Sequence, residues 1–197
     1  MTPIAVFVSG SGTNCEALIR HFSTSSEARV VLVVSSRPDA YALVRAANLG
    51  VPSVTFDKAH LNDPSAVLPV LEQYNIGFVV LAGFLPVFPD YLLEAFPRKV
   101  VNIHPALLPR FGGKGMYGHK VHEAVKAAGE TETGMTVHYV TSKVDSGEII
   151  EQFRVPLSPA DTVEDISEKE HQLEMKYFPK VIEKLIGRLG SSSDGEI

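Results

Sequence analysis

Short apolar runs alternate with amphipathic segments along the first half of the chain. The runs are largely apolar on both faces, as strands inside a parallel sheet are, and they predict strands at Ile4–Val8, Val30–Val34, Ser53–Thr55, Phe78–Leu81 and Val100–Ile103. The segments between them have helical patterns and predict helices over Glu16–Phe22, Ala40–Leu49, Pro64–Tyr74 and Asp90–Ala95. This alternation predicts a mostly parallel sheet with helices on both faces.

The second half departs from this alternation. A helix is predicted over His119–Ala128, and two strands, Met135–Val140 and Ile149–Val155, are separated by a short loop. That spacing suits an antiparallel pair. One long helical pattern covers Thr162–Leu189, and Pro179 inside it is a position where a helix can break or kink. The predicted fold class is therefore α/β: a Rossmann-like, mostly parallel sheet flanked by helices, with an antiparallel strand pair and a long helix toward the C-terminus.

Length and charge narrow the class of protein. The chain has 197 residues, enough for one substantial core. We expect residues 1–189 to form a single domain and the polar residues 190–197 to form a mobile tail. The net charge of -5 argues against nucleic acid or a membrane surface as partner, because both need clustered Lys and Arg. The expected partners are therefore small-molecule substrates. The protein is expected to be a monomer or a homodimer.

The single cysteine, Cys15, excludes an internal disulfide and fits a reducing compartment. The N-terminal residues lead directly into a strand with no basic flank, so a signal peptide is not expected. No apolar run reaches the roughly 18 residues that a membrane span needs. These features predict a cytoplasmic protein. Cys15 itself is expected to be a small buried helix residue, although a helix start can also lower a thiol pKa.

A Gly/Ser-rich segment, Ser9–Asn14, lies between the first predicted strand and the first predicted helix. Its glycines let a ligand approach the backbone, and the helix start offers free N–H groups and the positive end of the helix dipole. Thr13 and Asn14 can cap the helix and add donors. The segment is either a phosphate-binding loop or an ordinary turn with a helix cap. It lacks the Gly-Lys-Ser/Thr of a P-loop, and Cys15 replaces the third glycine of a dinucleotide-binding motif.

Two polar side chains, Asn102 and His104, stand at the end of the apolar strand that begins at Val100. They are two residues apart, so they point to the same side of an extended segment, and Pro105 ends the strand. Ligands of such sheets bind beyond the carboxyl ends of the strands. The pair is therefore a candidate reaction centre, and the alternative is a hydrogen-bonded Asn and His in a turn.

A third candidate is Asp145, which lies in the loop between the two predicted antiparallel strands. An Asp-x-Gly segment is also a common turn, so that interpretation stays open. His138 lies in mid-strand and is expected to form structural hydrogen bonds. His119 and His122 are three residues apart on a predicted helix and are expected on a solvated face. The histidines lack zinc spacing, so no metal site is predicted.

Taken together, these segments resemble the phosphoribosylglycinamide formyltransferases, which perform a folate-dependent formylation in purine synthesis. The resemblance covers roughly residues 3–188, and the Asn-Ile-His-Pro-x-Leu-Leu-Pro segment is specific to folate formyl-transferring enzymes. The matching segments occur in the family's order: Ser9–Asn14, Leu81-Ala82-Gly83-Phe84, Asn102-Ile103-His104-Pro105-Ala106-Leu107-Leu108-Pro109, Gly134–Val140 and Asp145-Ser146-Gly147.

The resemblance implies a role for each group of candidate residues. It makes Asn102, His104 and Asp145 the catalytic residues. It assigns the acceptor's phosphate and the neighbouring ribose region to Gly12, Thr13, Asn14 and Glu174. It assigns the folate to Leu85, Val87, Phe88, Asn102, Val140, Thr141 and Val144, largely through backbone groups.

Two departures from the family pattern stand out. Pro86 stands where some members carry Arg, so a side-chain contact to folate is in doubt. The segment Phe111–His119 is longer than in the shorter bacterial members. It is either a lid over the site, from which Lys114 reaches an anion, or an ordered surface loop.

The reaction that the resemblance implies moves the formyl group of 10-formyltetrahydrofolate, a co-substrate, onto the amine of glycinamide ribonucleotide in de novo purine (IMP) biosynthesis. The amine attacks directly, and Asn102 and a protonated His104 donate to the developing oxyanion. Asp145 pairs with His104, favours its charged form, or relays a proton. The alternatives are a formyltetrahydrofolate deformylase, which is a hydrolase, and a non-catalytic phosphate-binding α/β module.

Overall fold

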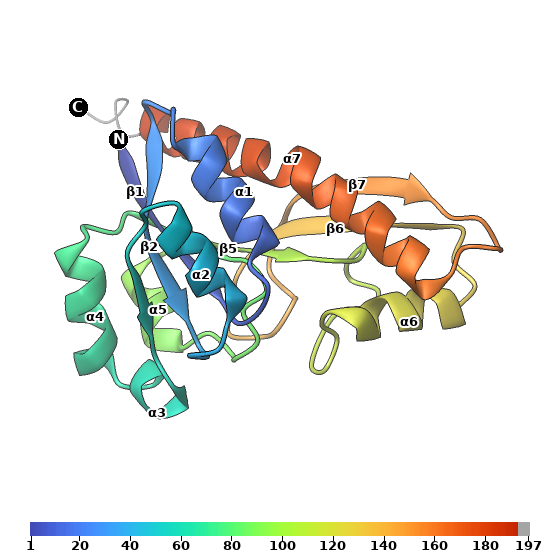
Figure 1. The fold of residues 1–197 in the computed structure, drawn as a ribbon, viewed down its shortest axis with the longest axis horizontal. Coiled ribbons are helices and arrows are strands. Elements are labelled where there is room, and N and C mark those ends of the chain that lie inside the picture. Colours follow the sequence, from blue (N-terminus) through green and yellow to red (C-terminus); the bar gives the residue numbers. More distant parts are fainter. Residues whose placement is uncertain (193–197) are drawn as a thin grey trace.

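One sheet of seven strands, in the order β3-β2-β1-β4-β5-β6-β7, runs through the molecule (Figure 1). The computed structural model describes residues 1–192 of the chain. The strands are β1 (Thr2–Val8), β2 (Ala28–Ser35), β3 (Ser53–Thr55), β4 (Phe78–Leu81), β5 (Val100–His104), β6 (Glu132–Tyr139) and β7 (Ile149–Pro156). The first five are parallel, whereas β6 runs antiparallel to β5 and β7 antiparallel to β6. The predicted mostly parallel sheet with an added antiparallel pair is confirmed.

Helices cover both faces of the sheet, and each face has its own buried cluster. On one face lie α1 (Thr13–Phe22), α2 (Tyr41–Asn48) and α7 (Val163–Ser192), which bury residues such as Leu18, Ala46 and Ile182. On the other lie α3 (Lys58–Leu61), α4 (Pro64–Gln73) and α5 (Asp90–Ala95), with Leu61 and Leu71 among their buried residues. The remaining helix, α6 (His119–Ala127), packs against α7, which runs past α1 toward β6 and β7 (Figure 1).

Local sequence explains where several helices begin. The Asp63 side chain accepts a hydrogen bond from the backbone N–H of Ser65, and Pro64 occupies the first turn, so α4 starts there. Thr162 and Asp165 exchange side-chain-to-backbone hydrogen bonds at the start of α7. The short helix α3 was not predicted, because its four residues are too few to show a helical period.

Helix boundaries differ from the prediction by three residues at two places and by one residue at several others. The first helix begins at Thr13 rather than Glu16, because Gly12 takes a left-handed conformation just before it. The last helix continues through Pro179 to Ser192, three residues beyond its predicted end. The first part of the predicted mobile tail is therefore helical, and residues 193–197 of that tail lie outside the described residues.

The fifth strand joins the parallel and antiparallel parts of the sheet. On one side it pairs in parallel with β4, where Asn102 stands opposite Leu81. On the other side it pairs with β6, where Asn102 stands opposite His138 and His104 opposite Thr136. This register fixes which side chains surround the two polar residues of β5.

Candidate active site

A cavity of about 830 Å³ brings together the site residues that the sequence predicted. That volume lies within the range of small-molecule sites. The lining includes the three candidate catalytic residues, Asn102, His104 and Asp145. It includes the predicted phosphate-site residues Gly12, Thr13, Asn14 and Glu174. It also includes the predicted folate-site residues Leu85, Val87, Phe88, Val140, Thr141 and Val144.

The Gly/Ser loop forms one end of this cavity and is held from behind by α2. Gly12 has φ +76°, and a Cβ placed there would lie 2.4 Å from the Cβ of Ala42. The backbone N–H of Ala42 donates to the carbonyl of Gly10 at 3.1 Å, and Nε of Arg45 donates to the carbonyl of Ser11 at 2.9 Å. The loop is thus fixed by close backbone packing that only glycine permits.

The expected capping role of Thr13 and Asn14 is wrong. Gly12 occupies the cap position of α1, and no side chain caps the helix. Asn14 instead uses Nδ2 to donate to Oε2 of Glu174 at 2.8 Å, across 160 positions of sequence. The first N–H groups of an α-helix have no partner within the helix, and here the first two belong to Thr13 and Asn14, which line the cavity. This arrangement suits an anion.

Cys15 follows Asn14 but lies in the core. Its side chain is fully buried among the residues beneath α1. Burial, assisted by the charge of Glu16, raises the pKa of the Cys15 thiol to about 12. The expectation of a buried cysteine is confirmed, and the lowering of its pKa that a helix start permits does not occur.

His119 is exposed, as expected, but His122 lies in the cavity lining, so the expectation of a solvated face is wrong for His122. Its side chain is 4% exposed, and its Nδ1 has no hydrogen-bond partner among the described residues. Burial lowers the pKa of His122, although the charge of Glu174 acts in the opposite direction. The burial of His122 could not be predicted from the helical spacing alone, because it results from the packing of α6 against α7.

His104 is buried at the end of β5, with 3% of its surface exposed. Its Nε2 lies 2.8 Å from the carbonyl oxygen of Phe111, which assigns a proton to Nε2. Its Nδ1 lies 3.6 Å from Oδ2 of Asp145. Burial lowers the pKa of His104, and the raising effect of Asp145 does not compensate. Asp145 favours the charged form of His104, as expected, but burial has the larger effect, so the net pKa is lowered.

Asp145 reaches His104 by an indirect path. Because β6 is antiparallel to β5, the loop after β6 leaves the sheet beside Val101, near the start of β5. The loop then doubles back, and Asp145 takes a left-handed conformation with φ +52°. The backbone N–H of Gly113 donates to its Oδ2 at 2.8 Å. Burial alone would raise the pKa of Asp145, but the net pKa is lowered, and the hydrogen bond from the Gly113 N–H contributes to this.

His138 was expected to form structural hydrogen bonds, and one of its contacts orients Asn102. Its Nδ1 donates to the carbonyl of Tyr139 at 2.9 Å, so in the neutral ring Nε2 is an acceptor. Nδ2 of Asn102 lies 3.1 Å from that acceptor. One amide proton of Asn102 is thereby engaged, which fixes the orientation of the amide. Only the strand register, which places His138 opposite Asn102, would have revealed this contact from sequence.

The segment after β5 holds two of the three candidate catalytic residues. Phe111 supplies the carbonyl that binds His104, and Gly113 supplies the N–H that binds Asp145. A Cβ on Gly112 would lie 2.4 Å from Leu108, so the backbone packs tightly here. Sequence analysis missed this role because backbone groups carry no side-chain signal. Whether the segment also moves as a lid stays a prediction.

Apolar side chains remain exposed along the predicted folate-binding part of the cavity. Leu85, Val87 and Val144 are between 43% and 67% exposed. Phe88 beneath them is buried and packs edge-to-face on Phe7 with ring centroids 5.3 Å apart. Exposed apolar residues around a cavity favour a flat, partly apolar ligand.

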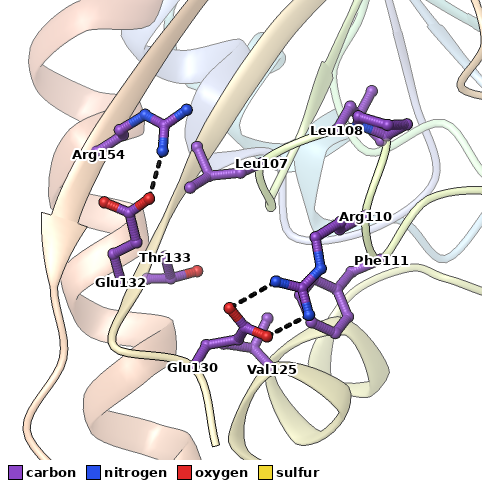
Figure 2. Close-up of a pocket in the computed structure, with 10 residues that line it drawn as sticks. Leu107, Leu108, Arg110, Phe111, Val125, Glu130, Glu132, Thr133 and Arg154 are labelled. Atoms are coloured by element: carbon purple, nitrogen blue, oxygen red, sulfur yellow. Dashed lines mark hydrogen bonds and ion pairs between the residues drawn. The ribbon is translucent and has the colours of Figure 1, made fainter. Parts of the chain in front are cut away.

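A smaller cavity of about 260 Å³ lies beyond the Leu107–Phe111 segment (Figure 2). Figure 2 shows two ion pairs along it, Arg110 with Glu130 and Arg154 with Glu132. The three candidate catalytic residues line the larger cavity and not this one. The chemistry that the sequence predicts therefore belongs to the larger cavity.

No cluster of three or more His, Cys, Asp or Glu side chains is placed to hold a metal ion within residues 1–192. Within the same range, no helix combines the length and apolar character needed to cross a membrane.

Known proteins are similar to this chain in sequence and in fold. The profile of the family described as formyl transferase matches residues 2–182. The phosphoribosylglycinamide formyltransferase of Bacillus subtilis (strain 168) is 36% identical over 192 residues, which are 95% of this chain and 96% of that protein. The chloroplastic phosphoribosylglycinamide formyltransferase of Arabidopsis thaliana is 40% identical over 185 residues, 91% of this chain, but the match spans only 63% of the plant protein. A solved structure, glycinamide ribonucleotide transformylase 1 from Geobacillus kaustophilus, has a TM-score of 0.85 and 38% identity, covering 94% of this chain and 99% of its own.

Proposed function

The chain belongs to the formyl transferase family, and from that membership we propose that it is a phosphoribosylglycinamide formyltransferase. It transfers the formyl group of 10-formyltetrahydrofolate to the amine of glycinamide ribonucleotide in de novo purine biosynthesis. The observation that supports this most is the cavity itself, which has Asn102, His104 and Asp145 in one part and the Gly12–Asn14 loop in another. Such an arrangement holds a phosphorylated acceptor beside a formyl donor.

Two parts of the cavity suit the two substrates. The N–H groups at the start of α1 bind the acceptor's phosphate, since they are backed by the positive end of a helix dipole. The exposed apolar side chains Leu85, Val87 and Val144 face the folate ring, which also contacts the backbone of Val140 and Thr141. The folate co-substrate supplies an activated formyl group. Holding both substrates in one cavity contributes much of the rate, because it removes the entropy cost of their encounter.

Asn102 and His104 divide the chemistry between them. One amide proton of Asn102 is engaged by His138, and the other is free to donate to the formyl oxygen as negative charge develops on it. His104 is neutral near pH 7 because burial lowers its pKa. Its Nδ1 accepts the proton that the attacking amine releases, directly or through water, and Asp145 stabilises the imidazolium that forms. The bond between the formyl carbon and the folate nitrogen then breaks, and the imidazolium returns the proton, directly or through water, to the departing nitrogen.

We extend the proposal to the setting of the enzyme. Residues 1–189 act as one formyltransferase domain, supported by the single sheet to which all seven strands belong. The substrates are small molecules, and the protein is a monomer or a homodimer. A cytoplasmic location is consistent with a lone cysteine that is buried as a thiol.

A direct assay tests the proposed function. Purified protein is mixed with glycinamide ribonucleotide and 10-formyltetrahydrofolate, and the folate spectrum and the formylated product are followed. Asn102→Ala should lower kcat by about 100- to 1000-fold, the loss typical of one oxyanion donor, with a small change in acceptor binding. Release of free formate without formylated product would identify a deformylase instead. Binding of both ligands without turnover would identify a non-catalytic module, and full activity of Asn102→Ala would refute the oxyanion role.

A further inference from the structure

Two glutamates one helical turn apart on α7, Glu170 and Glu174, face the acceptor end of the cavity. Both line it, and they are only 3% and 8% exposed. Residues four apart on a helix are neighbours on one face, so the two carboxyl groups are placed to approach each other. Two ionised carboxylates have no proton to share, so a hydrogen bond between them requires one to be protonated.

The surroundings decide which of the two holds the proton. Glu174 accepts a hydrogen bond from Nδ2 of Asn14 at 2.8 Å and lies 3.5 Å from Nδ1 of His171. Both neighbours stabilise a negative charge on Glu174. No such donor to Glu170 lies within residues 1–192, and burial, followed by the charge of Glu174, raises its pKa well above the ordinary value. Glu170 is therefore the protonated member of the pair.

Among the described residues, no positive charge acts measurably on the carboxyl group of Glu170. The titratable groups that line the cavity, besides the glutamate pair, are His104 on β5, Lys114 and Tyr117 in the loop before α6, His122 on α6, His138 on β6, Asp145 in the following loop and His171 on α7. Burial lowers the pKa of His104 and of His122, so neither is a cation at neutral pH. The pKa of His171 is raised, but by its hydrogen bond to Glu174. The charge that acts on Glu170 is that of Glu174.

Unpaired polar atoms gather around the same pair. Oε1 of Glu170, Oδ1 of Asn14 and Nδ1 of His122 have no hydrogen-bond partner among the described residues. All three residues are at least nine-tenths buried and line the cavity. Buried polar atoms are nearly always paired in proteins, so a cluster of unpaired ones in a cavity indicates a polar ligand.

We propose that Glu170 is a positioning residue of the acceptor subsite, a neutral carboxylic acid that donates a hydrogen bond to Glu174 and turns its other oxygen toward a hydroxyl of the acceptor's sugar. This inference rests on the proposed function. The proton has a second consequence, because it leaves the pair with one negative charge instead of two. A second buried charge at this end of the cavity would repel the phosphate of the acceptor.

Two substitutions at Glu170 and one matched control separate the roles. Glu170→Gln keeps a donor for Glu174 and an acceptor for the cavity, so the acceptor KM should stay within about twofold of wild type at neutral pH. Glu170→Leu removes both and should raise the acceptor KM about tenfold, the size expected for a hydrogen bond to a charged group, with kcat and the folate KM nearly unchanged. Glu168→Gln, at an exposed position of the same helix, should leave the acceptor KM nearly unchanged. Thermal unfolding checks that each variant is folded.

The pH dependence of the acceptor KM tests whether the glutamate pair carries one negative charge or two. In the wild type, the acceptor KM should rise as the pH is raised through the elevated pKa of Glu170, because the pair then gains its second negative charge. In Glu170→Gln that rise should be absent, since the amide does not titrate. Infrared spectroscopy of the ligand-free protein at neutral pH should show the C=O band of a protonated carboxyl. The band should be lost in Glu170→Gln and kept in Glu168→Gln.

Three results would overturn the proposal. The first is the absence of the carboxylic-acid band in the wild type. The second is an unchanged acceptor KM in a folded Glu170→Leu. The third is a fall in kcat together with an equal rise of the acceptor KM and the folate KM in Glu170→Gln. If Glu170→Leu does not fold, Glu170→Gln and the infrared band still decide. The proposed function fails separately, if wild-type protein makes no formylated glycinamide ribonucleotide, and the infrared result does not depend on that outcome.

Discussion

The two ends of the large cavity hold their polar groups in opposite ways. At the catalytic end, Asn102, His104 and Asp145 each have at least one partner from the protein, namely His138, Phe111 and Gly113. At the acceptor end, polar atoms of Asn14, His122 and Glu170 are buried without partners among the described residues. The catalytic end is thus organised before substrates bind, whereas the acceptor end offers groups that a ligand would complete.

This difference fits what each end has to do. Catalysis gains from groups that are already fixed where charge develops, because no energy is then needed to reorient them during the reaction. Binding gains from buried polar groups that only the correct ligand can satisfy, because a ligand lacking the matching groups leaves them unpaired. The contrast can be tested by changing each end separately.

The largest effect is expected at the catalytic end. Asp145→Asn removes the charge that stabilises a protonated His104 but keeps an oxygen for the Gly113 N–H. We expect kcat to fall about 100-fold, within the range of lost acid–base assistance, while the acceptor's dissociation constant changes less than about twofold. Steady-state kinetics and calorimetric binding measure the two quantities. Ser146→Ala, at the adjacent exposed position, is the control, and a weakened acceptor with intact kcat would contradict the division between the two ends.

An intermediate effect is expected at the acceptor end. In Gly12→Ala, a methyl group would meet Ala42, and the left-handed backbone disfavours any side chain. We expect the acceptor KM to rise about tenfold and the free energy of unfolding to fall by about 2–4 kcal/mol. Kinetics and denaturant unfolding test this. Gly10→Ala has open space and no left-handed φ, so it should be nearly neutral, and equal effects at the two glycines would show that the packing against α2 is unimportant.

The smallest effect is a pair of opposite pH dependences of stability. The pKa of His104 is lowered in the folded protein, so the unfolded chain binds protons first as the pH falls below about 6.5. His104 therefore costs stability on acidification, and His104→Gln should remove that loss. The pKa of His171 is raised by its hydrogen bond to Glu174. Its stabilisation is present at low pH and lost as the pH rises through that pKa, so His171→Gln should remove it.

Denaturant unfolding across the pH range gives the difference between wild type and each variant. The difference curves for His104→Gln and His171→Gln should slope in opposite directions. Parallel slopes would mean that the two ends do not differ in how they shift the pKa of a histidine. The variants also serve as controls for one another, since both replace His by Gln.

The sequence predicted the fold closely because its strands are short apolar runs with clear stops. The strand Phe78–Leu81 and the helix Asp90–Ala95 have the predicted bounds. The start of α1 was placed too late because Thr13, Asn14 and Cys15 follow Gly12 and look like part of a loop. The short helix Lys58–Leu61 was missed because its cap, Asp57, also suits a turn.

The site was predicted less completely, for two physical reasons. Contacts made by backbone groups, such as the Phe111 carbonyl and the Gly113 N–H, leave no pattern of side chains to detect. Contacts across elements depend on register and helix packing. For this reason His138 was given only a structural role and His122 a solvated position. Glu170 did leave a signal, one turn before Glu174 on a predicted helix, but its burial could not be inferred before α7 was placed on the sheet.

The loop that carries Asp145 is longer than the distance that it has to span. It leaves the sheet at Tyr139, opposite Val101, and must reach the level of His104, roughly 10 Å along β5. The six residues from Tyr139 to Asp145 would span roughly 20 Å if extended. Chain length therefore does not set the position of Asp145, and its few contacts do. We expect this carboxylate to be the first part of the catalytic trio to lose its place on warming, before the sheet that holds Asn102 and His104 begins to unfold.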